Sequence, residues 1–334
     1  MSERLLLAIE TSCDETAAAV VADDLQVRSS VVRSQIDLHQ EFGGVVPEVA
    51  SRAHLDAIDL VIPRALDAAG VTPADLKGIA VTRGPGLNGP LLVGVSTAKA
   101  LGLAWGLPVV GVNHLVGHLM SAYLDRSTEP AYPAVMLLVS GGHCLLADIG
   151  ERGSYRVMGG TVDDSVGEAY DKIARYLGLG YPGGPIVDRL AAGVTPATRL
   201  PRPMIDDGLD FSFSGLKTAT IRYSQQNPAV PVDAICAAFV DACMDVLVTK
   251  SERALRLVDG RSYILVGGVA ASPILRERVE AMCERTSVEL MVPPPRYSTD
   301  NAAMIGAAGW YYLDTFGPSD PRFGADPSLR FPNW

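Results

Sequence analysis

The sequence lacks the cysteine spacing that marks a disulfide framework or a cysteine-based zinc site. Its five cysteines are odd in number and scattered, and no two of them form a C-x-x-C pair. Isolated thiols of this kind predict a protein of a reducing compartment, the cytoplasm. The apolar start of the chain reaches Glu10 too soon for a secretory signal, and the most apolar stretch, 90–112, contains Lys99 and Pro108. We therefore expect neither a leader nor a membrane span.

The chain also lacks an excess of positive charge. It carries 38 acidic and 28 basic residues, for a net charge of −10, which argues against a protein that binds nucleic acid unaided. What is present in quantity is apolar sequence, 48% of 334 residues. That length predicts two domains or two similar halves, and the 33 glycines and 23 prolines favour the many strand-to-helix turns of an α/β fold.

A topological repeat organises the sequence. A strand, a polar turn and a returning strand are predicted at 5–22 and again at 134–149. A strand, a glycine-rich turn and a helix are predicted at 78–105 and again at 262–286. The proline-rich segment 125–133 lies between the two copies and is the best candidate for a domain boundary.

Two glycine-rich turns follow strands at corresponding places in the repeat. They are SGGH at 140–143 and GGVAAS at 267–272. Backbone N–H groups in such turns bind phosphate or other anions, although a tight hairpin or close packing also needs small residues there. The chain has no G-x-G-x-x-G after its first strand and no G-x-x-x-x-G-K-[ST], which argues against Rossmann and P-loop sites.

His114 and His118 are four residues apart on a predicted helix, so both imidazoles lie on one helix face. Histidine is scarce in this chain, and the pair follows a strand, where α/β proteins place their sites. The spacing therefore indicates a metal site. A metalloprotease would need a glutamate directly after the first histidine, and here the intervening residues are Leu115, Val116 and Gly117.

A third metal ligand should be a carboxylate. Asp300, at the start of the last predicted helix, is a candidate, although it could instead cap that helix. Chemistry alone does not favour Asp300 over Asp163, Asp164 or Asp171. Two histidines and one carboxylate with open positions suit Fe(II) or Zn(II).

Other acidic residues also follow turns. Asp171 could bind ribose hydroxyls, and Asp188 follows the Gly183–Gly184 turn, where a carboxylate also favours a helix start. Asp14 and Glu15 occupy the first predicted turn, where they could orient reacting groups or simply be solvated.

Ten motifs occur in order from Leu7 to about Trp310. They are AIETSCDET, EFGGVVPEVASRAH, GPGLNGPLLVG, NHLVGH, LLVSGGH, GEAYDK, YPGGP, DFSFSGLKT, GGVAAS and TDNAAMIG. Together they resemble the bacterial TsaD (Gcp) family of tRNA adenosine threonylcarbamoyltransferases. The resemblance implies an actin/Hsp70-like ATPase (ASKHA) fold with two duplicated RNase H-like halves around a central cleft. We expect the halves to be 1–130, completed by a C-terminal helical segment 301–334, and 131–300.

The resemblance also implies roles for individual residues. One divalent metal, expected to be Fe(II) with Zn(II) as the alternative, would be bound by His114, His118 and Asp300. Asp14 and Glu15 match an acidic turn thought to face the transfer site. Ser272 occupies a position where many members have asparagine. The substrate-binding positions are Leu138, Val139, Ser140, Gly141, Gly142, Asp171, Gly184, Asp188 and Ser272.

The implied reaction moves the threonylcarbamoyl group of threonylcarbamoyl-AMP to the exocyclic amine of the adenosine 3′ of the anticodon, in tRNAs that read ANN codons. A separate synthase would supply the donor, and a TsaB-like paralogue and a TsaE-like ATPase would be partners. Three alternatives stay open: a metal-dependent (glyco)protease, an actin-like ATPase or sugar kinase, and a scaffold without catalytic activity.

Overall fold

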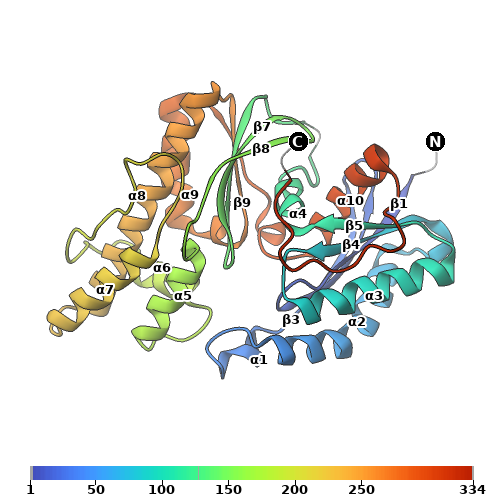
Figure 1. Cartoon of the computed structure of the whole chain (residues 1–334), viewed down its shortest axis with the longest axis horizontal. Helices are drawn as coiled ribbons and strands as arrows, with labels where there is room; N and C mark the ends of the chain where they lie inside the picture. The colour runs from blue at the N-terminus through green and yellow to red at the C-terminus, as the bar shows by residue number, and fades with distance from the viewer. Residues whose placement is uncertain (1–2, 127, 333–334) are drawn as a thin grey trace. The chain divides into compact units, whose positions relative to one another are not determined.

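The computed structural model of the chain describes residues 3–126 and 128–332 (Figure 1). The chain forms two compact units, one comprising residues up to Glu129 together with Pro293–Pro332, the other Pro130–Val292. Each unit is built on one five-stranded sheet. Among the helices of the described residues, none has the length and apolar character needed to cross a membrane.

The sheet of the first unit has the strand order β3-β2-β1-β4-β5. Its first three strands are antiparallel neighbours, whereas β4 and β5 are added in parallel, so that Leu7 of β1 pairs with Val20 on one side and Ile79 on the other. The strands are β1 Leu5–Glu10, β2 Glu15–Ala22, β3 Val27–Ser34, β4 Leu76–Gly84 and β5 Val109–Asn113.

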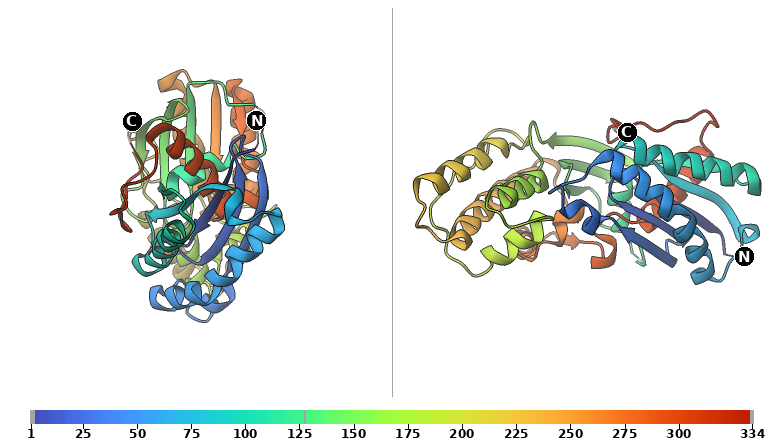
Figure 2. Two further views of the ribbon diagram at one scale, coloured as in Figure 1. Left: turned by 90° about the vertical axis from the view of Figure 1, so that its right-hand side faces the viewer. Right: turned by 90° about the horizontal axis from the view of Figure 1, so that it is seen from below.

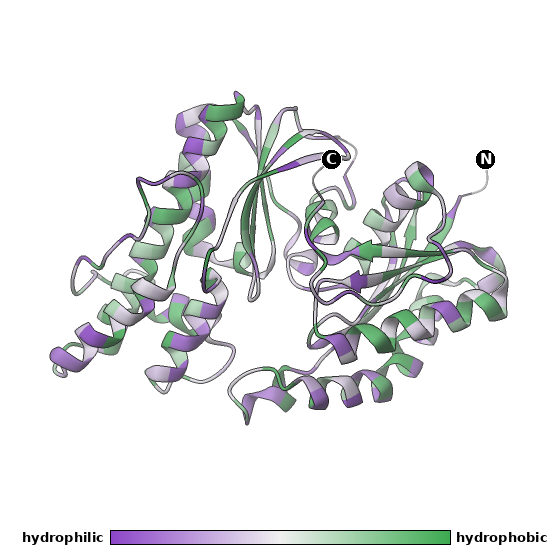
Figure 3. Cartoon of the chain, in the orientation of Figure 1, coloured by the Kyte–Doolittle hydropathy of each residue, from purple (hydrophilic) through white to green (hydrophobic). Residues whose placement is uncertain are grey.

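Helices cover both faces of this sheet, which explains why β1 is apolar from Leu5 to Ile9. Leu7 and Ile9 pack with residues of α2 (Pro47–Ala69) and α3 (Asn88–Trp105). On the opposite face, glycines of α10 (Ala302–Phe316) bring that helix close to β1 and its neighbours. Figure 2 shows α2 and α3 side by side, and Figure 3 shows hydrophobic and hydrophilic residues alternating around them.

The last strand of this sheet leads directly into α4 (His114–Ser121). Asn113 begins the helix, because its side-chain oxygen accepts hydrogen bonds from the backbone N–H groups of Leu115 (2.9 Å) and Val116 (3.4 Å). Every residue of α4 is buried. The smaller elements of the unit are α1 (Ile36–Gln40), η1 (Pro73–Asp75) and η3 (Pro295–Tyr297).

The segment that follows α10 is irregular and proline-rich, and it lies along β4, α3 and β5 (Figure 1). The Lys99 ammonium donates to the Phe323 carbonyl (2.9 Å), and the Asp326 N–H donates to the Arg83 carbonyl (2.7 Å). Asn113 donates its side-chain N–H to the Arg330 carbonyl (2.8 Å). The end of the chain therefore contacts the same asparagine that begins α4.

The sheet of the second unit has the order β10-β9-β6-β7-β8, with β6 taking the central place that β1 has in the first unit. Again three strands are antiparallel neighbours and two are parallel additions. The topological repeat predicted from the sequence is confirmed. The elements are β6 Ala134–Val139, β7 Cys144–Glu151, β8 Ser154–Gly160, α5 Val166–Tyr176, α6 Gly183–Ala191, α7 Ser214–Gln226, α8 Val232–Val258, β9 Ser262–Val266, η2 Gly268–Ala271, α9 Pro273–Thr286 and β10 Glu289–Met291.

Candidate functional site

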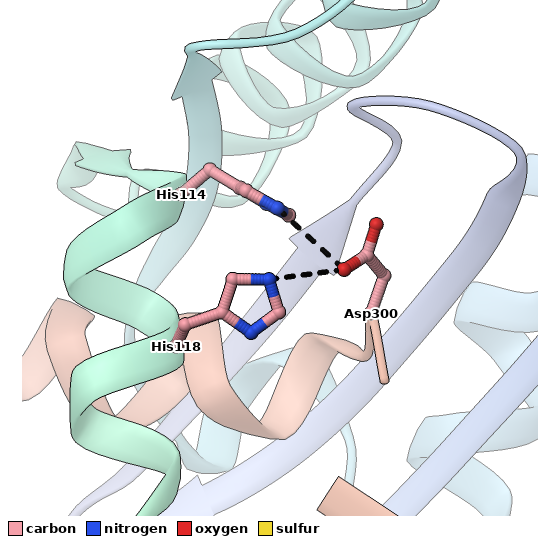
Figure 4. A group of neighbouring side chains, drawn as sticks. All are labelled: His114, His118 and Asp300. Carbon is pink, nitrogen blue, oxygen red and sulfur yellow. Dashed lines mark ion pairs between the residues drawn. The ribbon is translucent and has the colours of Figure 1, made fainter. Parts of the chain in front are cut away.

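The three residues predicted to bind a metal lie together in the first unit. His114 is the first residue of α4, and His118 follows one turn later, so both rings point to the same side of the helix (Figure 4). The ring centroids are 4.7 Å apart with an interplanar angle of 81°. Asp300 Oδ1 lies 3.5 Å from His114 Nε2 and 3.2 Å from His118 Nε2. One atom from each of the three residues lies within 4.8 Å of the other two.

The alternative role of Asp300 as a helix cap does not apply. The cap of α10 is Asn301, whose side-chain oxygen accepts from the Met304 N–H at 3.0 Å. The other carboxylates considered, Asp163, Asp164 and Asp171, belong to the second unit and bind groups there. Asp163 accepts from the backbone N–H of Phe213, and Asp164 forms an ion pair with Lys217 at 2.6 Å.

The residues present fit a metal ion. His118 is 1% exposed, and its Nδ1 has no hydrogen-bond partner among the described residues. Its Nε2 lies 3.2 Å from Asp300 Oδ1 but makes no hydrogen bond of good geometry. Buried polar atoms without a partner are rare in native proteins and call for an explanation. A cation bound by the two Nε2 atoms and Asp300 would satisfy His118 Nε2 and compensate the carboxylate. The group is compatible with a single metal site.

The charges around His114 favour its protonated form. Burial by itself lowers the pKa of an imidazole, but the carboxylates of Asp300 and Glu10 outweigh it and raise the pKa of His114 to about 9. Glu10 Oε2 lies 3.0 Å from His114 Nδ1. At neutral pH without a metal, both ring nitrogens of His114 therefore carry a proton, and a metal must displace one of them.

This proton makes metal affinity dependent on pH. Below pH 9, each unit of acidification is expected to weaken binding by about tenfold, because one proton competes at His114. Titration of the metal-free protein with Zn²⁺ against a chelator between pH 6.5 and 8.5 measures the slope. An affinity that stays constant over this range would contradict the assigned protonation of His114.

The acidic turn predicted from the sequence lies at the start of β2. Glu15 is the first residue of that strand, and its carboxyl accepts from the Ser34 hydroxyl at 3.0 Å. Burial raises the pKa of Glu15 to about 9, and the charges of Asp14 and Asp300 add to this effect. At neutral pH Glu15 is therefore a neutral carboxyl group that can donate a hydrogen bond.

The glycine hairpin of the second unit joins β6 to β7. Leu138 and Val139 are the last, buried residues of β6. The Ser140 N–H donates to the His143 carbonyl (2.8 Å), and the Ser140 hydroxyl accepts from the His143 N–H (3.1 Å). Gly141 and Gly142 form the exposed tip between them. The turn is a tight hairpin with accessible backbone.

The second glycine-rich turn lies against this hairpin. Gly267, directly after β9, has φ = +95°, and a Cβ atom there would collide with the Val139 carbonyl. Only glycine fits that position without displacing β6. The two turns predicted to bind an anion therefore meet at the ends of neighbouring strands of one sheet.

The remaining predicted binding residues lie on α5, α6 and α9. The Asp171 carboxylate accepts from the Gly183 N–H (2.8 Å) at the start of α6, next to Gly184. Asp188 is buried in the middle of α6 rather than at its start, and its Oδ1 has no hydrogen-bond partner among the described residues. Burial raises the pKa of Asp188, and the neighbouring hydroxyls of Ser272 and Tyr170 oppose this shift. Ser272 caps α9 by accepting from the Leu275 N–H (3.2 Å).

Residues 26–307 match the sequence profile of the family described as TsaD: tRNA N6-adenosine threonylcarbamoyltransferase. The chain belongs to the TsaD family. It is 52% identical over 315 residues to the tRNA N6-adenosine threonylcarbamoyltransferase of Trichlorobacter lovleyi, covering 92% of each chain. It is 46% identical over 341 residues to the protein of the same name from Halalkalibacterium halodurans, covering 100% of this chain and 98% of that protein.

Solved structures at low identity support the fold expected of a TsaD member. Component A of the Acidaminococcus fermentans (R)-2-hydroxyglutaryl-CoA dehydratase has a TM-score of 0.57 at 13% identity, covering 93% of this chain and 100% of that one. Full-length HypF has a TM-score of 0.63 at 12% identity, covering 95% and 47%. These likenesses, with the two matching sheets, show the actin-like ASKHA fold.

The TsaD motifs at 8–16 and 41–54 contain residues whose contacts were not predicted from the sequence. Glu10, at the end of β1, is 1% exposed and contacts His114. His54 is fully buried on α2, with Nδ1 2.7 Å from the Thr16 hydroxyl and Nε2 3.0 Å from the Cys13 carbonyl. A lone acid that ends an apolar strand is a signal that could have identified Glu10. His54 has no comparable signal in the sequence.

Proposed function

We propose that this protein transfers the threonylcarbamoyl group from threonylcarbamoyl-AMP to the N6 amine of the adenosine 3′ of the anticodon, in tRNAs that read ANN codons, and releases AMP. The observation that carries the proposal is the convergence of His114, His118 and Asp300 in a chain that belongs to the TsaD family. The free state of all five cysteines is in keeping with action in the cytoplasm.

His114, His118 and Asp300 would hold one divalent metal, which we propose to be Fe(II), with Zn(II) as the alternative. Such an ion supplies Lewis-acid chemistry and a template for donor oxygens. The shared orientation of the two Nε2 atoms toward Asp300 Oδ1 supports this assignment.

The second unit would bind the adenylate part of the donor. The exposed glycine tip of the hairpin after Leu138 and Val139 offers backbone N–H groups for a phosphate. The unpartnered Oδ1 of Asp188 is an acceptor for a ribose hydroxyl or a base amine. Asp171 holds the start of α6 through the Gly183 N–H, which places Gly184 and Asp188 on one short helix.

Positioning rather than base catalysis would dominate the transfer. The exocyclic amine of adenosine is a weak nucleophile, and aligning it with the carbamoyl carbon can supply a large part of the barrier reduction. Glu15, neutral at pH 7, suits hydrogen-bond donation rather than proton abstraction. Asp14, its neighbour in the turn, is the second proposed residue of the transfer site.

Depletion of the protein tests the proposed function directly. Mass analysis of tRNA nucleosides from depleted cells is expected to show loss of threonylcarbamoyladenosine, and expression of the intact chain is expected to restore it. An unchanged level of this nucleoside after depletion would overturn the proposal.

Replacing Ser272 by asparagine is expected to preserve the fold and to tighten adenylate binding by a few fold. Asparagine caps helices as well as serine does, and its amide offers both donors and an acceptor near Asp188. Calorimetric titration with AMP measures the change in affinity.

The matched control is Ser272→Ala. Alanine removes the cap on the Leu275 N–H and is expected to cost about 1 kcal/mol of stability. A large loss of AMP binding in Ser272→Asn, with the melting temperature unchanged, would show that the pocket around Ser272 differs from that of family members with asparagine at this position.

A further inference from the structure

We propose that Glu10 is a positioning residue that fixes the tautomer of His114 for metal binding. The proposal rests on the metal site of the proposed function. Glu10 is the last residue of β1, and its side chain is 1% exposed. Burying a carboxylate costs free energy unless other groups pair with it. The groups that pair with Glu10 therefore indicate its role.

Three segments direct hydrogen-bond donors at this carboxylate. Oε2 accepts from the Thr82 hydroxyl of β4 at 2.6 Å and lies 3.0 Å from His114 Nδ1. Oε1 accepts from the backbone N–H of Ser12, in the turn that follows β1. Since β1 and β4 are neighbouring strands and α4 follows β5, the sheet itself holds Glu10 against the ring.

An ionised carboxylate can only accept hydrogen bonds. His114 Nδ1 must therefore keep a proton directed at Glu10. When a metal displaces the second proton of the ring, the lone pair is on Nε2, the atom that faces Asp300 at 3.5 Å. A carboxylate in this position fixes the orientation of a ligating histidine and makes its other nitrogen a better donor to a metal. Glu10 thus holds His114 ready to bind through Nε2.

The second histidine of the group has no such support. His118 Nδ1 is buried without a hydrogen-bond partner in the part of the chain that the structure describes. Of the two imidazoles, that of His114 is the one with a carboxylate at Nδ1, so the loss of Glu10 should act on metal binding through His114.

Glutamine at position 10 would keep the volume of the side chain but reverse its chemistry. If its oxygen stays on the Ser12 N–H, its NH₂ group faces Nδ1 and selects the tautomer that is protonated on Nε2. If the amide is flipped, its NH₂ group faces the Ser12 N–H, and two donors meet. The first arrangement opposes metal binding at His114. The flipped arrangement keeps the Nδ1 proton in place, but the contact between the two donors disfavours it.

The test is a chelator competition with Zn²⁺ on the full-length protein at fixed pH. Glu10→Gln is expected to bind Zn²⁺ about 10- to 100-fold more weakly than the parent. Thr82→Val is the matched control, because it removes a donor to the same carboxylate but leaves Glu10 against His114. This control is expected to bind Zn²⁺ as tightly as the parent.

The outcomes separate the role of Glu10 from the metal site. A parent protein that binds no Zn²⁺ would refute the site, and the proposal with it. Equal affinity of the parent and Glu10→Gln would refute only the role of Glu10. If Glu10→Gln does not fold, ¹⁵N-histidine NMR of the Zn²⁺-loaded parent decides: a protonated Nδ1 and a metal-bound Nε2 on His114 are expected, and the reverse assignment overturns the proposal.

Discussion

Replacing both His114 and His118 by alanine is expected to abolish bound transition metal and threonylcarbamoyl transfer together. Two of the three converging ligands are removed, and Asp300 alone offers a single carboxylate. The fold should survive at a lower melting temperature, because Glu10 keeps its bonds to Thr82 and the Ser12 N–H. Elemental analysis of the purified protein and a transfer assay measure both effects.

A histidine outside the group provides the control. His39 is also buried in the first unit, where Nε2 lies 3.2 Å from the Gln35 side-chain oxygen. The variant His39→Gln is expected to retain its metal. Wild-type metal content in a folded double alanine variant would refute the ligand assignment, whatever happens to activity.

The isolated protein is expected to bind tRNA weakly at physiological salt and to turn over little. Its net charge of −10 repels a polyanion. Two basic residues that could contribute to a tRNA surface are already paired, Arg28 with Glu3 and Lys217 with Asp164 at 2.6 Å. We therefore infer that helper proteins, a TsaB-like paralogue and a TsaE-like ATPase, supply basic surface or fix the geometry of the site.

Filter binding of anticodon-bearing tRNA, with and without these proteins, measures the effect. Adding the partners is expected to restore both binding and turnover, and binding should weaken steeply with salt. An unmodified tRNA that lacks an ANN-reading anticodon controls for non-specific attraction. Tight binding and repeated turnover by the isolated chain would show that it already carries a sufficient basic groove.

The elements that the sequence predicts best are those with a strong pattern of their own. The predicted ranges 5–22 and 262–286 agree with the outer bounds of β1 and β2 and of β9 and α9, because the apolar runs there are separated by short turns of polar or small residues. The edge strands β3 and β8 were missed. Val27–Ser34 is mostly polar and half exposed, and its strand structure comes from pairing with β2. The short helix α6 begins in a Gly-Gly-Pro turn that reads as a loop.

The sequence predicts those contacts of the candidate site that join residues close together in the chain, and not those that join distant segments. His114 and His118 are one helical turn apart, so their spacing alone indicates a shared face. The choice of Asp300 among several carboxylates came from family resemblance, because a contact over so long a stretch of chain depends on the fold. The contact of Glu10 with His114 across the sheet was not foreseen for the same reason.

The first unit is made of two stretches of chain separated by the whole second unit, so its parts are synthesised at different times. The histidines of α4 leave the ribosome early, but Asp300, α10 and the segment that bonds to Asn113 come after the entire second unit. At about 5–20 residues per second, roughly 10–40 s of translation separate the first ligands from the last. His114, His118 and Asp300 can therefore come together only on a nearly finished polypeptide, and a nascent chain that stalls in between holds the two histidines without Asp300.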